Sequence, residues 1–315
     1  MANLASPLAR TAIAVGAAGA ACVAYGVFIE HTWYREQRYG LEILPPGAEP
    51  LTILHVSDLH FIRGDRRKRE FVASLKPADV AVITGDMLGE PEGVEIAVEA
   101  VRHIRGRVAS YVVLGSNDYY VPQPINPLDY LIRDYRPQKG VVSRWRELVA
   151  LLEADGWEHL RNVKTTLDHR GTRVEVVGLD DPHINRQDIR VAPRNRPDEF
   201  GLAIVHSPDP APELAALGYD LILAGHTHGG QVRLPFLGAI FTNSLVPAKI
   251  GMGLSRLGPA LMHISPGLGT SKFAPFRFLC RPEATYLELL PKRSHARHPD
   301  VSGVQVPRER SEARS

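Results

Sequence analysis

Several short apolar runs in this chain are rich in β-branched residues and end abruptly in polar side chains. They occupy 52–56, 80–84, 111–114, 174–177, 202–205 and 221–224. Runs of this length and composition are typical of strands buried on both faces of a sheet. Between some of them, as at 94–104 and 145–152, apolar residues keep helical spacing. Strands that alternate with helices predict an α/β fold, in which ligands bind beyond the carboxyl ends of the strands.

Five of these strand ends carry side chains of the types that bind divalent metals. They are Asp58, His60, Asp86, Asn117, His206, His226 and His228. Carboxylate and amide oxygens combined with neutral imidazoles suit Mn, Fe or Zn. Seven ligands are too many for one ion and about right for two that share a bridging carboxylate. We therefore expect a site for two divalent metal ions, whose identity the residues leave open.

Charge and cysteine content exclude other classes of protein. The chain has 37 Lys and Arg against 35 Asp and Glu, so bulk charge does not indicate a nucleic-acid binder. We therefore expect no nucleic-acid partner. Only two cysteines occur, Cys22 and Cys280, which excludes a disulfide framework and a cysteine-based zinc finger.

An uncharged segment of 19 residues lies near the N-terminus, from Thr11 to Ile29. We favour a single-pass anchor in the cell membrane, because the length is close to the roughly 20 residues that a spanning helix needs. A cleaved signal peptide is the alternative, with Ala18 and Ala20 offering a small-residue cleavage site and a secreted product. A buried Ala-rich helix is a third. The flanking Lys and Arg are too evenly distributed to assign the membrane face.

Composition divides the chain into four predicted segments. Residues 1–39 form the anchor region, and 40–50, with adjacent prolines and no helical period, form a linker. Residues 51–290 form the folded domain. Residues 291–315 are rich in charge and poor in apolar side chains, so we expect a disordered tail.

The motifs at these strand ends resemble those of the calcineurin-like metallophosphoesterases. The matching blocks are SDLH at 57–60, GD at 85–86, GSND at 115–118, HSPD at 206–209 and GHTHGGQ at 225–231. GHTHGGQVRLPFLG (225–238) is similar to the membrane-linked bacterial branch, which includes UDP-2,3-diacylglucosamine diphosphatase-like enzymes and broad phosphodiesterases. The resemblance covers about residues 50–290.

This resemblance implies a four-layer α/β/β/α sandwich and two metal sites. Asp58, His60 and His228 would bind the first ion, Asn117, His206 and His226 the second, and Asp86 would bridge them. A hydroxide shared by both ions would then attack phosphorus in line.

One motif departs from the family, which usually has Gly-Asn-His-Asp where this chain has Gly115-Ser116-Asn117-Asp118. Aligned without a gap, Ser116 takes the place of the metal-binding Asn. Aligned with a shift of one residue, Asn117 is the ligand and the His is missing. We favour Asn117, because an amide oxygen binds a divalent cation better than a neutral hydroxyl does. His183, in the GLDDPH loop, is a candidate replacement for the lost His.

The leading hypothesis is a metal-dependent phosphoesterase that acts at the membrane on a lipid- or nucleotide-linked substrate. The missing His favours diphosphates, whose leaving group is already stable, over ordinary phosphodiesters. The alternative is a metal-binding pseudoenzyme that serves as an interaction or regulatory module. A run of basic residues, 63–69, is either a solvated helix face or a contact for phosphate or anionic lipid.

Overall fold

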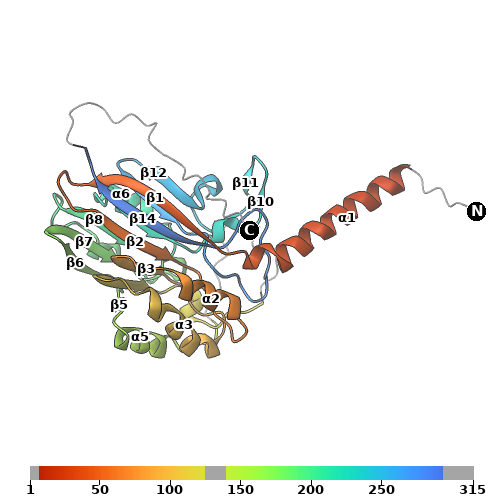
Figure 1. Cartoon of the computed structure of the whole chain (residues 1–315), viewed down its shortest axis with the longest axis horizontal. Helices are drawn as coiled ribbons and strands as arrows, with labels where there is room; N and C mark the ends of the chain where they lie inside the picture. Colours follow the sequence, from red (N-terminus) through yellow and green to blue (C-terminus); the bar gives the residue numbers. More distant parts are fainter. Residues whose placement is uncertain (1–6, 125–139, 294–315) are drawn as a thin grey trace, which may run out of the picture.

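The computed structural model describes residues 7–124 and 140–293, and its main body is a stack of two sheets between layers of helices (Figure 1). Each sheet has six strands. The order in the first is β1-β14-β2-β3-β4-β5, and in the second β12-β13-β9-β8-β7-β6. Both sheets mix parallel and antiparallel pairs. The predicted α/β/β/α sandwich is confirmed.

The strands that lead to the predicted ligands run parallel within each sheet. In the first sheet, β2, β3, β4 and β5 are parallel neighbours, and in the second β7, β8, β9 and β13 are. The strands of the first sheet are β1 (Arg35–Leu44), β2 (Leu51–Val56), β3 (Val80–Thr84), β4 (Ala109–Val113), β5 (Glu158–His159) and β14 (Glu283–Pro291). Those of the second are β6 (Val163–His169), β7 (Thr172–Gly178), β8 (Phe200–Ile204), β9 (Leu221–Ala224), β12 (Gly253–Leu257) and β13 (Ala260–Ile264).

Three apolar layers hold the stack together, because alternate residues of a strand face opposite sides of its sheet. Ile53 packs between the two sheets with Val82 and Leu202, whereas its neighbour Leu54 faces the helices. The helices on that outer face are α2 (Arg66–Ser74), α3 (Val94–Val101) and α5 (Trp145–Ala154). On the other side, α6 (Ala211–Ala216) covers the second sheet.

The predicted linker at 40–50 is wrong in its first half. Residues 40–44 continue β1, which pairs in parallel with β14 from Arg35 opposite Glu283. Leu41 and Leu44 are buried in the layer between the sheets, so the folded domain begins before residue 51. In β1 the apolar residues at 39, 41 and 43 alternate with polar residues or glycine, a half-buried pattern that differs from the continuous apolar runs by which the other strands were predicted. Lys292 still bonds to Leu44, and the predicted tail lies outside the described residues from 294 onward.

Helix α1 (Pro7–Phe28) contains the uncharged segment and projects away from the sheets (Figure 1). The helical segment Ala9–Thr32 is long and apolar enough to cross a membrane, and almost none of it is buried. The interpretation as a buried helix of this domain is therefore wrong.

Two smaller elements lie beside the loops that carry predicted ligands. The single turn α4 (Ser116–Tyr119) follows β4, and β10 (Arg233–Leu234) and β11 (Gly238–Ala239) form a hairpin after the loop that carries His228. The hairpin lies near the base of α1 (Figure 1).

Candidate metal centre

The predicted ligands converge at one edge of the sandwich, since parallel strands end on the same side. Asp58 and His60 follow β2, and Asp86 follows β3. Asn117 lies in α4, directly after β4. From the second sheet, His206 follows β8, and the pair His226 and His228 follows β9.

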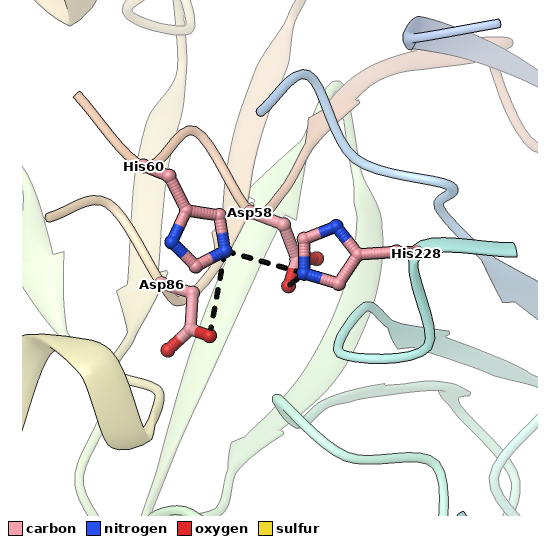
Figure 2. A group of neighbouring side chains, drawn as sticks. All are labelled: Asp58, His60, Asp86 and His228. Carbon is pink, nitrogen blue, oxygen red and sulfur yellow. Dashed lines mark hydrogen bonds and ion pairs between the residues drawn. The ribbon is translucent and has the colours of Figure 1, made fainter. Parts of the chain in front are cut away.

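Four of these side chains form a tight cluster, shown in Figure 2: Asp58, His60, Asp86 and His228. One ligand atom from each lies within 4.8 Å of all the others. The Nε2 atoms of His60 and His228 are 3.2 Å apart, and Nε2 of His228 is 3.4 Å from Oδ1 of Asp58. Asp86 Oδ2 lies 3.7 Å from His60 Nε2.

The other three predicted ligands form a second group next to Asp86. His206 Nε2 is 3.6 Å from Asp86 Oδ2 and 3.3 Å from His226 Nδ1. The Asn117 amide donates to Asp86 Oδ2 over 2.5 Å. Through Oδ2, the Asp86 carboxylate therefore lies within 4 Å of members of both groups.

The atoms of the first group fit a cation better than they fit one another. Among the described residues, Asp58 Oδ1 is a buried carboxylate oxygen with no hydrogen bond, although Asp58 Oδ2 accepts from Ser57 Oγ (2.5 Å) and from the backbone N–H of His226 (3.0 Å). A buried anionic oxygen left unpaired is expensive unless it coordinates a metal. The facing imidazole nitrogens likewise present lone pairs to a common point.

The backbone is unusual at most of these positions. Asp58, His60, Asp86, His226 and His228 all have positive φ angles, between 42° and 68°. Few residues other than glycine adopt this region, and such conformations cluster at functional sites. The sharp turns direct successive side chains back towards the strand ends, which explains how ligands two residues apart reach the same centre.

Small residues let the loops approach the ligands closely. A Cβ atom on Gly115 would lie 2.6 Å from His206 Nε2, and one on Gly267 would lie 2.7 Å from Asp58 Cβ. Gly267 also has a φ of +75°. Both positions therefore require glycine for steric reasons.

Buried polar side chains that the sequence did not single out hold the ligand loops. Asp118 accepts from the backbone N–H groups of Met87 (2.7 Å) and Gly115 (3.0 Å), and so ties the loop after β3 to the loop after β4. Lys68, in the basic run, is buried and donates to the His60 carbonyl (3.2 Å). Its neighbours Arg66 and Arg67 are exposed, as a solvated helix face predicts.

A second support lies under Asp58. The buried Arg277 guanidinium donates to the carbonyls of Pro266 and Gly269, both over 2.7 Å. The N–H of Gly269 in turn donates to the Asp58 carbonyl over 2.6 Å. Arg277 is far from the motifs in the sequence, so nothing in its local pattern marked this role.

Opposite charges shift the titration of the central groups. Burial alone would raise the pKa of Asp86, but His206, His60 and the Asn117 hydrogen bonds hold that pKa well below its usual range. Burial alone would lower the pKa of His206, but Asp86, Asp181 and Asp58 raise it to about 9. The centre thus stabilises positive charge beside Asp86, the property that a metal site needs.

The altered loop brings Asn117, through its side chain, to the centre. Besides the amide contact, the Asn117 backbone N–H donates to Asp86 Oδ1 over 2.9 Å. Exchanging the amide oxygen and nitrogen by a χ2 rotation would direct the oxygen at the same position. The structure thus places the Asn117 side chain against Asp86, and the role of Asn117 as a metal ligand stays a prediction.

His183 lies at the edge of the centre. Its ring is 4.4 Å from the His226 ring, measured between centroids, and it is partly exposed. It is part of a short 3-10 turn, Pro182–Ile184, in which the Asp181 side chain accepts from the His183 N–H over 2.9 Å. The GLDDPH loop thus places an imidazole beside the second group of ligands.

Comparison with known proteins gives a consistent assignment. Residues 51–230 match the family model described as calcineurin-like phosphoesterase. The chain is 26% identical over 260 residues to the metallophosphoesterase YkoQ of Bacillus subtilis, covering 81% of this chain and 87% of YkoQ. It is 24% identical over 273 residues to the phosphodiesterase YaeI of Escherichia coli (84% and 92% covered). It is 25% identical over 286 residues to the UDP-2,3-diacylglucosamine pyrophosphatase LpxG of Chlamydia trachomatis (76% and 84% covered).

Proposed function

Because this chain belongs to the calcineurin-like phosphoesterases, we propose that it is a metal-dependent phosphohydrolase with two divalent ions, acting on a lipid- or nucleotide-linked diphosphate at a membrane. Asp58, His60 and His228 would hold one ion, and Asn117, His206 and His226 the other. The ions would be Mn, Fe or Zn.

The observation that carries this proposal is the position of Asp86. Its Oδ2 atom lies 3.7 Å from His60 Nε2 in one group of ligands and 3.6 Å from His206 Nε2 in the other. A single carboxylate between two such groups suits two ions that share it.

When bound, the ions would supply Lewis acidity and an activated water for attack on phosphorus. The protein residues would hold the ions and orient the phosphate at the carboxyl ends of the parallel strands. His183 lies next to His226, so it can hold a proton for the departing oxygen. No side-chain nucleophile is needed.

The substrate class follows from the altered loop and from the relatives. With no His in Gly115-Ser116-Asn117-Asp118, the chain lacks the acid that the family usually places there. A phosphate or nucleoside monophosphate leaves without strong protonation, so a diphosphate tolerates the loss best. LpxG is a pyrophosphatase by name, which supports this preference over a broad phosphodiesterase, the activity named for YaeI.

The membrane context rests on α1. An exposed apolar helix at the N-terminus suits a single-pass anchor that holds the site near lipid-linked substrates. Cleavage as a signal peptide would instead release the domain.

The test is turnover by the purified full chain with added Mn²⁺. The substrates are a UDP-linked diacylated sugar and bis(4-nitrophenyl) phosphate. We expect release of UMP from the first, and a loss of at least about 10³-fold in Asp86→Asn, since a shared ligand affects both ions. Elemental analysis should show close to two ions per chain, and fewer in the variant. Asp198→Asn, at an exposed carboxylate, is the matched control and should keep wild-type values.

Two outcomes would contradict the proposal. Full single occupancy that is unchanged in Asp86→Asn would exclude a shared two-metal site. Normal metal content without turnover of either compound would favour the metal-binding pseudoenzyme.

A further inference from the structure

The segment after His228 exposes an unusual number of large apolar side chains. Within 234–245, six are exposed, and we call them the apolar rim: Leu234, Phe236, Leu237, Ile240, Phe241 and Leu245. Phe236, at the tip of the β10–β11 hairpin, is fully exposed, and Leu245 is 81% exposed. Large apolar side chains that are exposed together on one short segment are typical of an interaction site in a folded protein.

The apolar rim is attached to the metal centre at two points. The hairpin starts at Arg233, five residues after His228, and Arg233 donates to the Gly229 carbonyl over 3.0 Å. Farther along, the Asn243 carbonyl lies 3.0 Å from His226 Nε2. Asn243 is flanked by the exposed Phe241 and Leu245, so the rim borders the ligands directly.

The apolar rim is also joined to the base of α1. The backbone groups of Gln231 and Arg233 pair with Phe278 (2.9 Å each). The Phe278 ring meets Tyr25 of α1 edge to face, with 6.3 Å between centroids. One end of the domain therefore carries the helix, the rim and the metal centre (Figure 1).

Charge identifies the partner that this end suits. The chain as a whole is nearly neutral, but residues 221–282 contain no Asp or Glu and six Lys and Arg, of which Arg277 is buried and Arg256 lies in β12, opposite the start of β13 and away from this end. Arg233 and Lys249 flank the apolar rim. Trp33, just after α1, is half exposed and stacks with Arg281, whose Cζ lies 4.0 Å from the ring centroid. Apolar side chains bordered by cations and an exposed tryptophan are typical of a contact with an anionic bilayer.

We propose that the apolar rim is a second membrane contact, which inserts between the headgroups of an anionic bilayer and holds the metal centre at the lipid surface. The proposal rests on the membrane anchoring suggested for α1 under the proposed function. It adds an orientation: a lipid-linked diphosphate could reach the ligands without leaving the bilayer, because the chain between His226 and the rim is short.

The direct test places an environment-sensitive label on the rim of the full chain. Cys22→Ser removes the exposed native thiol, Cys280 is buried, and Phe236→Cys is then labelled with a nitrobenzofurazan dye. The probe membrane is a vesicle of phosphatidylcholine and phosphatidylglycerol. We expect a blue shift and quenching by lipids that carry a quencher on the acyl chain. The matched control is Val108→Cys, which replaces an exposed apolar residue just before β4, at the opposite edge of the sheet.

Each outcome decides the matter. If the dye at 236 shows no larger blue shift than the dye at 108 when vesicles are added, the proposal is overturned. A blue-shifted dye at 236 that the lipid quenchers do not quench would overturn it too. In that case a second copy of the protein or another part of the chain would cover the apolar rim. Retention in the membrane after a carbonate wash reports separately on α1, so failure of the anchor is distinguishable from failure of the rim.

A functional readout separates docking from chemistry. The triple variant Phe236→Ser, Leu237→Ser, Leu245→Ser should raise KM for the vesicle-borne diphosphate at least about tenfold. Its turnover of soluble bis(4-nitrophenyl) phosphate should stay within about twofold, which also shows that it folds. Equal losses on both substrates would contradict a docking role.

Discussion

The Nδ1 atom of His55 lies 2.8 Å from the Nδ1 atom of His263, and this contact joins the two sheets beneath the metal centre. His55 belongs to β2 and His263 to β13, and both are completely buried. His55 Nε2 is 2.9 Å from Thr84 Oγ1, and the Thr84 carbonyl lies 2.6 Å from His206 Nδ1. The pair therefore supports His206 from below through Thr84. When both rings are neutral, only one of the two facing Nδ1 atoms carries a proton, which it donates to the other.

This pair predicts a loss of stability in acid. Burial lowers the pKa of His263 to about 3, and burial with the neighbouring His263 lowers the pKa of His55 well below its usual value. The unfolded chain takes up these protons first, near pH 6.5. The contribution to the free energy of unfolding is therefore complete above about pH 6.5 and falls by roughly 1.4 kcal/mol per pH unit for each His below it.

Urea unfolding of the metal-free protein between pH 7 and 5, in mild detergent, measures this slope. His263→Asn should flatten it, because one titrating group is gone. His103→Asn, at an exposed histidine, should leave it close to that of the wild type. Equal slopes in all three proteins would show that the pair does not titrate in this way.

Asn117, and not Ser116, should control the affinity of the second ion. The Asn117 side chain contacts Asp86, whereas a neutral Ser hydroxyl is a poor ligand. Asn117→Ala should weaken that ion ~10–100-fold or more, and Ser116→Ala should change it only a few-fold. Calorimetric metal titration of both variants measures this. The reverse ranking would establish the gap-free alignment.

His183 should matter in proportion to the basicity of the leaving group. If it protonates the departing oxygen, His183→Gln should slow an alkyl phosphodiester ~10²–10⁴-fold and barely affect a nitrophenyl ester. Metal content should be unchanged, which separates this role from a structural one beside His226. A uniform loss across leaving groups would exclude proton transfer, and His103→Gln serves as the control.

Glu30 should stabilise the junction between α1 and the domain. Its buried carboxylate accepts from the backbone N–H groups of Leu279 (2.9 Å) and Cys280 (2.5 Å). Cys280 Sγ in turn donates to the His228 carbonyl over 3.3 Å. Glu30→Ala leaves two buried donors unpaired, so it should destabilise the protein by roughly 1–3 kcal/mol for each.

Thermal unfolding of the full chain in detergent measures that loss. Glu36→Ala removes an exposed carboxylate six residues away and should change stability by less than about 0.5 kcal/mol. If the two variants unfold alike, the Glu30 contacts contribute nothing to the junction.

The strands and the candidate ligands could be predicted from the sequence because each depends on a local pattern. A run such as 80–84 has to be buried on both faces wherever it lies, and β3 and β9 match their predicted ranges. Polar residues directly after such runs lie at a sheet edge by continuity of the chain. Strand β1 was missed because it lies at the edge of its sheet and alternates apolar with polar residues, so it contains no continuous apolar run.

Residue types at the strand ends were enough to predict which side chains could bind metal, but their division around Asp86 was expected only from the family resemblance and not from spacing. That division depends on two sheets packing face to face, which brings His60 and His228 to 3.2 Å across 168 residues. The contacts of Lys68, Arg277 and Glu30 with the ligand loops were likewise decided only by tertiary structure. A single hydrogen bond between distant residues leaves no periodicity in the chain, because its partner is selected by packing and not by spacing.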